Sequence, residues 1–215
     1  MRENKADDKS RIGTKERILQ SARQVFAERG FDGASTRDIA AGASVNISSL
    51  HYHWDSKERL YRAVFADIYR ELVGLIEGDV SHPQTQEEAR AVIERTMGTV
   101  FDVFAADPTI PKLLLRRMLE APDPADAVQN ALGPTWKVFI DWARTFAGGE
   151  ISPEDMSFKL VSVQAALLVS LLDSPHVAVM LGWTSNEARR RARLRRQTLA
   201  LVETLMGVGD SPDAR

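Results

Sequence analysis

A short stretch in the first quarter of the chain gathers side chains that can form hydrogen bonds with DNA. It carries hydroxyl, imidazole and phenol groups in close succession, at Ser48, Ser49, His51, Tyr52 and His53. Groups of these kinds suit the base edges in the major groove and the phosphate oxygens beside it. His51 and His53 are two positions apart and would point to different faces of a helix, which argues against a pair of metal ligands.

The remaining sequence supports no other reactive chemistry. The chain has no cysteine, which excludes disulfides, thiolate metal sites and a cysteine nucleophile. It has four scattered histidines and none of the G-x-S-x-G, H-E-x-x-H or glycine-rich phosphate-binding motifs. We therefore expect a protein that is not an enzyme and that uses no metal and no cofactor.

Helix caps on both sides position the hydrogen-bonding stretch. Ser35 is typical of an N-cap residue, and Asp38 three positions later can complete a capping box. Ser56 indicates a further helix start, which opens with Lys57. The stretch is thus expected to lie between two helices whose first turns are fixed by local hydrogen bonds.

A helix-turn-helix is the arrangement that the sequence between these caps predicts. Gly42-Ala43-Ser44 indicates a break, and a second short helix is expected over about Ile47–His53. Two short helices joined by a tight turn, the second rich in exposed polar groups, are typical of a DNA-binding unit. Apolar residues at helical spacing would bury the inner side of the pair; these are Ile39, Val45, Leu50 and Trp54.

Length and composition indicate an ordinary globular protein. The 215 residues are 44% hydrophobic and 27% charged. No run of about 18 apolar residues occurs and the N-terminus lacks the apolar core of a signal peptide, so we expect no membrane segment and a cytoplasmic location. Residues 1–60 hold 11 Lys/Arg against 9 Asp/Glu, and the remainder holds 17 against 21. This weak bias suits DNA contact by the N-terminal part.

Helical periodicity continues through the chain without strand patterns, so we predict an all-α fold of about nine helices. Beyond the helix-turn-helix, helices are expected near 14–29, 57–78, 85–106, 110–120 and 125–147, then one from Ser152-Pro153 and a last one capped at Thr184. We divide the chain into a flexible arm at 1–12, a helix-turn-helix domain at 13–60, a helical ligand-binding and dimerisation domain at 61–207, and a disordered tail at 208–215.

The segment from Ile18 to Leu60 resembles the N-terminal DNA-binding region of TetR-family regulators. The residues that match the family's pattern are Phe26, Gly30, Phe31, Ser35-Thr36, Asp38-Ile39-Ala40, Val45-Asn46, Leu50, Tyr52-His53-Trp54 and Ser56-Lys57-Glu58-Leu60. The chain departs from that pattern at Ser44 and Ser48, where glycine is usual, and at His51, where tyrosine is frequent. We expect Ser44 to give a slightly different turn, since a non-glycine residue at positive φ is costly.

The resemblance implies that the helix over about Ile47–His53 enters the major groove of a double-stranded DNA operator. It also implies that Lys57 holds a backbone phosphate, while a hydroxyl at a helix N-terminus suits another phosphate. The predicted DNA contacts are Thr36, Arg37, Asn46, Ser48, Ser49, His51, Tyr52, His53 and Lys57.

The resemblance further implies a homodimer on a palindromic operator, with a small-molecule effector bound among the C-terminal helices. The run SVQAALLVSLL is apolar on nearly all sides, which suits a helix buried on two faces. The expected dimer contacts are Leu167, Leu168, Leu171, Leu201 and Leu205. The expected effector contacts, for each of which a plain core role is the alternative, are Met97, Phe101, Phe104, Met118, Trp136, Phe139 and Gln164.

The sequence thus favours a ligand-responsive transcriptional regulator, most often a repressor in this family, that an apolar or aromatic effector releases from DNA. The alternative is a helical DNA-binding dimer that is regulated by a protein partner or acts without a small ligand. Six arginines between Arg189 and Arg196 are expected to form a solvated helix face paired with acids. A second surface for an anionic partner is the other interpretation of that run.

Overall fold

The computed structural model describes residues 13–77, 83–119, 127–144, 151–172, 179–180, 182 and 187–208, without the side chains of 77, 127–135 and 187. The predicted arm at 1–12, the predicted cap Thr184 and all but the first residue of the predicted tail lie outside these residues.

The described part of the chain is entirely helical, as the sequence predicted. Its helices are α1 (Thr14–Gly33), α2 (Thr36–Gly42), α3 (Ile47–His53), α4 (Lys57–Glu77), α5 (Gln86–Ala106), α6 (Thr109–Leu119), α7 (Ala127–Arg144), α8 (Pro153–Ser170) and α10 (Glu187–Met206).

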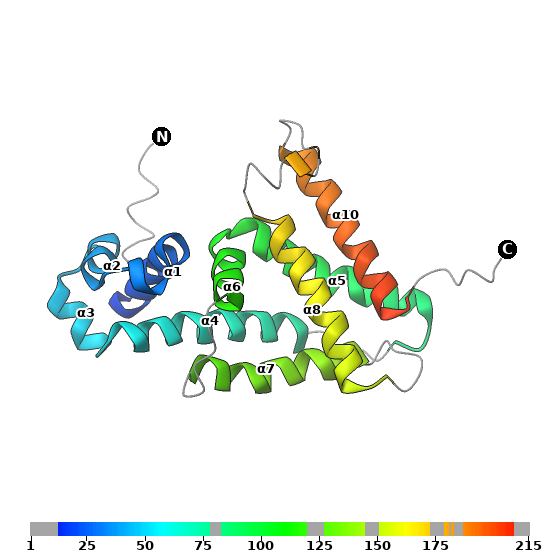
Figure 1. Ribbon diagram of the computed structural model, residues 1–215, viewed down its shortest axis with the longest axis horizontal. Coiled ribbons are helices and arrows are strands. Elements are labelled where there is room, and N and C mark those ends of the chain that lie inside the picture. The colour runs from blue at the N-terminus through cyan, green and yellow to red at the C-terminus, as the bar shows by residue number, and fades with distance from the viewer. Residues whose placement is uncertain are drawn as a thin grey trace.

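The first three helices form a unit at one end of the long helix α4 (Figure 1). We call α1–α3 the N-terminal unit. Helix α4 leaves this unit and continues among the later helices, where α7 packs along it. Helix α6 packs against α1, α8 contacts α6 and α7, and α10 packs on α5 and α8. The predicted domain boundary between residues 60 and 61 therefore falls inside α4, which takes part in both regions.

Side-chain caps fix the starts of α2, α3 and α4. In each case an oxygen accepts the N–H of the residue three positions later: Ser35 Oγ at 3.1 Å, Asn46 Oδ1 at 2.7 Å and Ser56 Oγ at 3.2 Å. These bonds satisfy donors that the first turn of a helix leaves unpaired. The carboxylate of Asp38 accepts the Ser35 hydroxyl at 2.7 Å and the Arg29 guanidinium at 2.6 Å, in place of the predicted bond to the Ser35 backbone.

The turn between α2 and α3 is a Schellman motif whose left-handed position is occupied by serine. Ser44 has a φ of 55°, so the turn keeps a left-handed residue at this position although that residue is not glycine. Its N–H donates to Ala41 O at 3.0 Å, and the N–H of Val45 donates to Ala40 O at 3.0 Å. This pair of bonds closes the end of α2 and sets the direction in which α3 begins.

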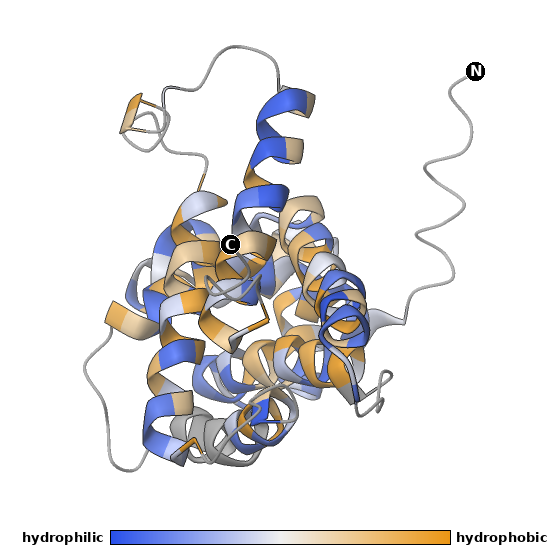
Figure 2. Cartoon of the chain, turned by 90° about the vertical axis from the view of Figure 1, so that its right-hand side faces the viewer, coloured by the Kyte–Doolittle hydropathy of each residue, from blue (hydrophilic) through white to orange (hydrophobic). Residues whose placement is uncertain are grey.

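One apolar core extends from the N-terminal unit into the later helices. Phe26, Leu50 and Leu60 are fully buried and join α1, α3 and α4. Val45 and Trp54, which were expected in this core, pack against it while half-buried. Hydrophilic and hydrophobic bands alternate along the helices, as expected where each helix has one buried and one exposed face (Figure 2).

Candidate functional site

Helix α3 presents polar side chains outward from a single buried anchor. Leu50 is completely buried, whereas Ser48 and His51 are exposed and Tyr52 is 84% exposed. A large aromatic side chain with that exposure contributes little to the fold of the subunit, so its phenol group is available for a partner. The ring of Tyr52 meets His53 edge-on with centroids 5.2 Å apart, which orients both side chains.

Four other predicted DNA contacts lie near α3 in different settings. The carboxamide oxygen of Asn46 caps α3 by accepting the N–H of Ser49. The side chain of Ser49 is half-buried. Thr36 and Arg37 form the first turn of α2, with Arg37 exposed and Thr36 half-buried. Both residues are thus placed where free backbone N–H groups and a guanidinium can meet a phosphate.

Lys57 is held by the protein itself. Its ammonium donates to Phe31 O at 2.9 Å and to Ala34 O at 3.2 Å, and it lies 4.3 Å from the centre of the Phe31 ring. These contacts tie the start of α4 to the end of α1. An ammonium has three N–H donors, so one of them remains for the predicted phosphate.

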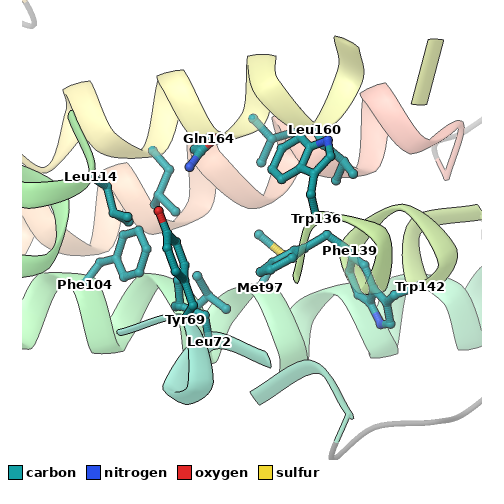
Figure 3. Close-up of a pocket in the computed structure, with 13 residues that line it drawn as sticks. Tyr69, Leu72, Met97, Phe104, Leu114, Trp136, Phe139, Trp142, Leu160 and Gln164 are labelled. Carbon is teal, nitrogen blue, oxygen red and sulfur yellow. The ribbon is translucent and has the colours of Figure 1, made fainter. Parts of the chain in front are cut away.

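The later helices surround a cavity whose wall is almost wholly apolar (Figure 3). Its empty space is about 680 Å³ where the open mouth is included. Helices α4, α5, α6, α7 and α8 all contribute to it. The lining residues are Tyr69, Leu72, Met97, Val100, Phe104, Leu114, Trp136, Phe139, Trp142, Leu160, Val163, Gln164 and Leu167.

The cavity gathers five of the seven predicted effector contacts: Met97, Phe104, Trp136, Phe139 and Gln164. The other two are placed elsewhere. Phe101 is fully buried without lining the cavity, and Met118 is 47% exposed near the end of α6. The sequence interpretation missed Tyr69 and Leu72, because on α4 they are indistinguishable from residues of an ordinary buried helix face.

Polar groups are few in the wall of the cavity. Among the described residues that line the cavity, Gln164 supplies the only carboxamide and none carries a charge. The Tyr69 oxygen and the Gln164 amide lie toward the same end, while Trp136, Phe139 and Trp142 gather toward the other (Figure 3). An ion in such a surrounding would lose its hydration without a countercharge, so the wall favours uncharged molecules.

Helix α8 carries apolar stripes on two opposite faces. Leu160, Val163 and Leu167 face the cavity, whereas Phe158 and Val161 are 75% and 42% exposed. At about 100° per residue, an offset of two positions between the stripes separates them by roughly 200°. The sequence predicted burial on more than one face; in the described subunit only the inner stripe is buried, and nothing there covers the outer stripe.

The predicted dimer contacts divide in the same way. Leu167 and Leu168 are buried inside the subunit, at 3% and 0% exposure, because they belong to the inner face of α8. This placement corrects the expectation that they lie on the dimer surface. Leu171 and Leu205 are half-buried and Leu201 is 36% exposed.

The arginine run lies on α10 and is partly paired with acids of α5. Arg195 contacts Glu94 at 2.6 Å and Asp102 at 3.4 Å, and Arg191 lies 3.7 Å from Asp102. The hydrogen bond that Arg195 donates to the Glu94 carboxylate raises the pKa of Arg195 above its ordinary value. The pairing agrees with the interpretation of this run as a structural helix face.

Two classes of site are missing from the described residues. None of their helices is long and apolar enough to cross a membrane. Nor do the described residues contain a cluster of three His, Asp or Glu side chains that could hold a metal ion.

Comparison with known sequences finds matches that centre on the N-terminal unit and the start of α4. Residues 18–64 match the family described as bacterial regulatory proteins, tetR family. Over 95 residues, or 44% of each chain, there is 30% identity to the Bacillus subtilis protein named probable HTH-type transcriptional regulator YttP. Over 48 residues there is 40% identity to the biofilm operon icaADBC HTH-type negative transcriptional regulator IcaR of Staphylococcus epidermidis, covering 22% of this chain and 26% of that one. The chain thus spans less than half the length of these relatives.

Solved structures share the fold over most of the chain. A TetR-like transcriptional regulator from Rhodococcus sp. RHA1 aligns with a TM-score of 0.60 at 18% identity, covering 90% of this chain and 96% of that one. HlyIIR, a hemolysin II transcriptional regulator, aligns with a TM-score of 0.59 at 18% identity, covering 86% and 96%. At such low identity the likeness concerns the fold alone.

Proposed function

We propose that this chain, a member of the TetR family through its DNA-binding region and its fold, is a transcriptional repressor that binds a palindromic operator as a homodimer and is released by a small uncharged effector. The observation that carries the proposal is the outward polar face of α3, held in place by one buried leucine, Leu50. This function requires a double-stranded DNA operator as the partner and the cytoplasm as the location.

The DNA contacts follow from the exposed groups of the N-terminal unit. Ser48, His51 and Tyr52 are proposed to read base edges in the major groove, since they are the exposed polar residues of α3. Arg37 and Thr36 at the start of α2 are proposed to hold a phosphate and so fix the register of the unit on the duplex. The division of the chain into this domain and a helical sensor domain is part of the proposal.

A homodimer is supported by the outer face of α8 and the neighbouring face of α10. Phe158, Val161, Val169 and Leu201 are large apolar side chains that remain exposed in the subunit. Helices α8 and α10 pack on one another, so two copies can pair these helices into a four-helix interface. A twofold pair would place the two α3 helices about one DNA turn apart, roughly 34–36 Å.

The cavity is proposed as the effector site, and its wall indicates the kind of effector. A molecule that fits is apolar or aromatic, carries no charge, and has one hydrogen-bonding group for Gln164. Helix α4 joins this site to DNA, because it carries Tyr69 in the cavity wall and Lys57 at the N-terminal unit. An effector that displaces α4 would change the separation of the two α3 helices. The free energy by which it shifts the protein between the two arrangements cannot exceed the difference between its binding free energies for them.

The proposal is tested by selecting bound duplexes from random sequence with the purified chain. We expect a palindrome whose half-sites are centred about one helical turn apart. Failure to enrich any sequence, or enrichment of a site without twofold symmetry, would contradict the function or the dimer respectively.

Variants of exposed residues sharpen this experiment. His51→Ala is expected to weaken binding about tenfold or more and to relax specificity at one base pair of each half-site. Gln86→Ala, an exposed substitution at the start of α5, is the control and should leave both unchanged. Binding that falls equally for all sequences would assign His51 to a phosphate, and a steep salt dependence without sequence preference would favour a DNA-binding dimer of another kind.

A further inference from the structure

The C-terminal end of α1 has no basic residue of its own in its last turn. Carbonyl groups at the end of a helix carry partial negative charge and need donors from elsewhere. At Gly30 the backbone leaves the helical conformation, with φ 71° and ψ −179°, which exposes the carbonyls of the preceding turn. The groups that bind these carbonyls therefore decide how the N-terminal unit is held.

Cations from both neighbouring helices supply the donors. Arg116 of α6 donates through Nε to Ala27 O at 3.2 Å and through Nη2 to Glu28 O at 2.9 Å. Lys57 of α4 binds the carbonyls that follow the bend. The α1 end is thus fixed to two helices that both continue among the cavity-lining helices.

Glycine at position 30 permits the approach of Arg116 as well as the bend. A Cβ atom there would lie 3.2 Å from Arg116 Nη1, closer than almost all real contacts of a Cβ atom. A planar guanidinium with several fixed donors can bind two successive carbonyls at once, which a lysine ammonium does with less geometric control. The contact therefore constrains the direction of α1 as well as its distance from α6.

Helix α6 is attached to α1 at its other end too. Arg23 of α1 contacts Asp107 at 2.9 Å and Thr109 Oγ1 at 3.1 Å, at the start of α6. The two attachments lie at opposite ends of α6, so they fix the orientation of α6 relative to α1 as well as the distance between the two helices. The same helix supplies Leu114 to the cavity wall.

We propose that Arg116 is a positioning residue for operator binding, which fixes the orientation of the N-terminal unit relative to the rest of the subunit so that both α3 helices of a dimer meet half-sites of one spacing. This inference rests on the proposed function. It adds that spacing is set by a guanidinium–carbonyl contact between α6 and α1, at a place that touches neither DNA nor effector.

The test measures how strictly each variant recognises the spacing of the half-sites. Duplexes carry the selected palindrome or the same half-sites separated by two additional base pairs, and affinities are measured at one salt concentration. The wild type should prefer the selected spacing. In Arg116→Gln this preference should fall about tenfold, the equivalent of one charge-assisted hydrogen bond, while a single isolated half-site binds as in the wild type.

The ratio of two affinities separates positioning from stability, because a smaller folded fraction weakens binding to every duplex equally. Lys112→Gln removes an exposed cation from the same helix and should keep the wild-type ratio. Arg116→Lys retains the charge and most of the side chain, and its ratio should lie between those of the wild type and Arg116→Gln. If Arg116→Gln is too unstable to measure, Arg116→Lys takes its place and should still give a ratio below that of the wild type. An unchanged ratio in both Arg116 variants overturns the inference. If the wild type itself prefers no sequence, it is the proposed function that fails.

Discussion

Replacing Ser44 by glycine should stabilise the protein, because it removes backbone strain from the turn that sets the direction of α3. Ser44 has a φ of 55°, where a non-glycine residue loses roughly 1–2 kcal/mol relative to its preferred conformations. Glycine avoids this loss but gives the unfolded chain additional freedom, which offsets about 0.4–1 kcal/mol. The exposed side chain of Ser44 makes no hydrogen bond in the structure, so the net gain in the free energy of unfolding is about 0.5–1 kcal/mol.

The assay is urea unfolding followed by circular dichroism, with thermal unfolding as a second measurement. For a chain of this size a gain of that order raises Tm by about 1–4 °C. Ser48→Gly is the matched control, since it makes the same chemical change at an exposed residue with helical backbone in α3. There glycine should lower stability by about 0.5 kcal/mol, because it is a poorer helix former than serine.

The structure requires the two substitutions to change the free energy of unfolding in opposite directions, upward for Ser44→Gly and downward for Ser48→Gly. If Ser44→Gly were neutral or destabilising while Ser48→Gly behaved as expected, the strain assigned to the turn would be wrong. If both substitutions stabilised the protein, the explanation would lie in the unfolded chain and not in the backbone at position 44.

The remaining predictions concern the cavity, the α10 ion pairs and the start of α4. The neutral dye N-phenyl-1-naphthylamine should bind at least about tenfold more tightly than its 8-sulfonate, measured by fluorescence, because the apolar wall offers the sulfonate no countercharge; equal affinities would contradict an uncharged effector. Arg195→Ala should lower stability by about 1 kcal/mol in low salt, whereas Arg193→Ala, on the exposed side, should change it by less than about 0.5 kcal/mol; 1 M salt should reduce the difference. The pKa of Glu58 is lowered by its backbone N–H and then by the Ser56 hydroxyl, so the carboxylate favours folding at neutral pH and this contribution is lost as pH falls through its folded pKa. In an NMR titration, Ser56→Ala should move that pKa upward; no movement would assign the shift to the backbone alone.

The parts of the fold that depend on residues close in sequence could be predicted from the sequence. The caps of α2, α3 and α4 each join a side chain to an N–H three residues later, so spacing alone locates the start of these helices. The bounds of α3 agree with the expectation of Ile47–His53. A helix of seven residues between two such signals leaves little freedom for its register.

The parts that depend on helix packing could not be predicted in the same way. The cavity is assembled by five helices, and nothing in the periodicity of α4 distinguishes Tyr69 from a core residue. Likewise, the all-round apolar sequence of α8 indicated two buried faces without showing which one the subunit itself covers. Leu167 was therefore expected at a dimer surface and lies in the cavity wall. The bond of Arg116 to a carbonyl 88 positions earlier leaves no local pattern at all.

The two cations at the end of α1 restrict how an effector could act. Along α4, Tyr69 lies 12 residues beyond Lys57, or roughly 18 Å at 1.5 Å per residue. A tilt of about 5° at the cavity would thus move the start of α4 by about 1.5 Å. Because Lys57 binds the carbonyls after Gly30 and Arg116 binds those before it, movement of α4 relative to α6 must be absorbed at that glycine. A side chain at position 30 would oppose both the positive φ and the approach of Arg116. The bend at Gly30 is therefore the place where we expect the response of the sensor helices to become a rotation of α2 and α3.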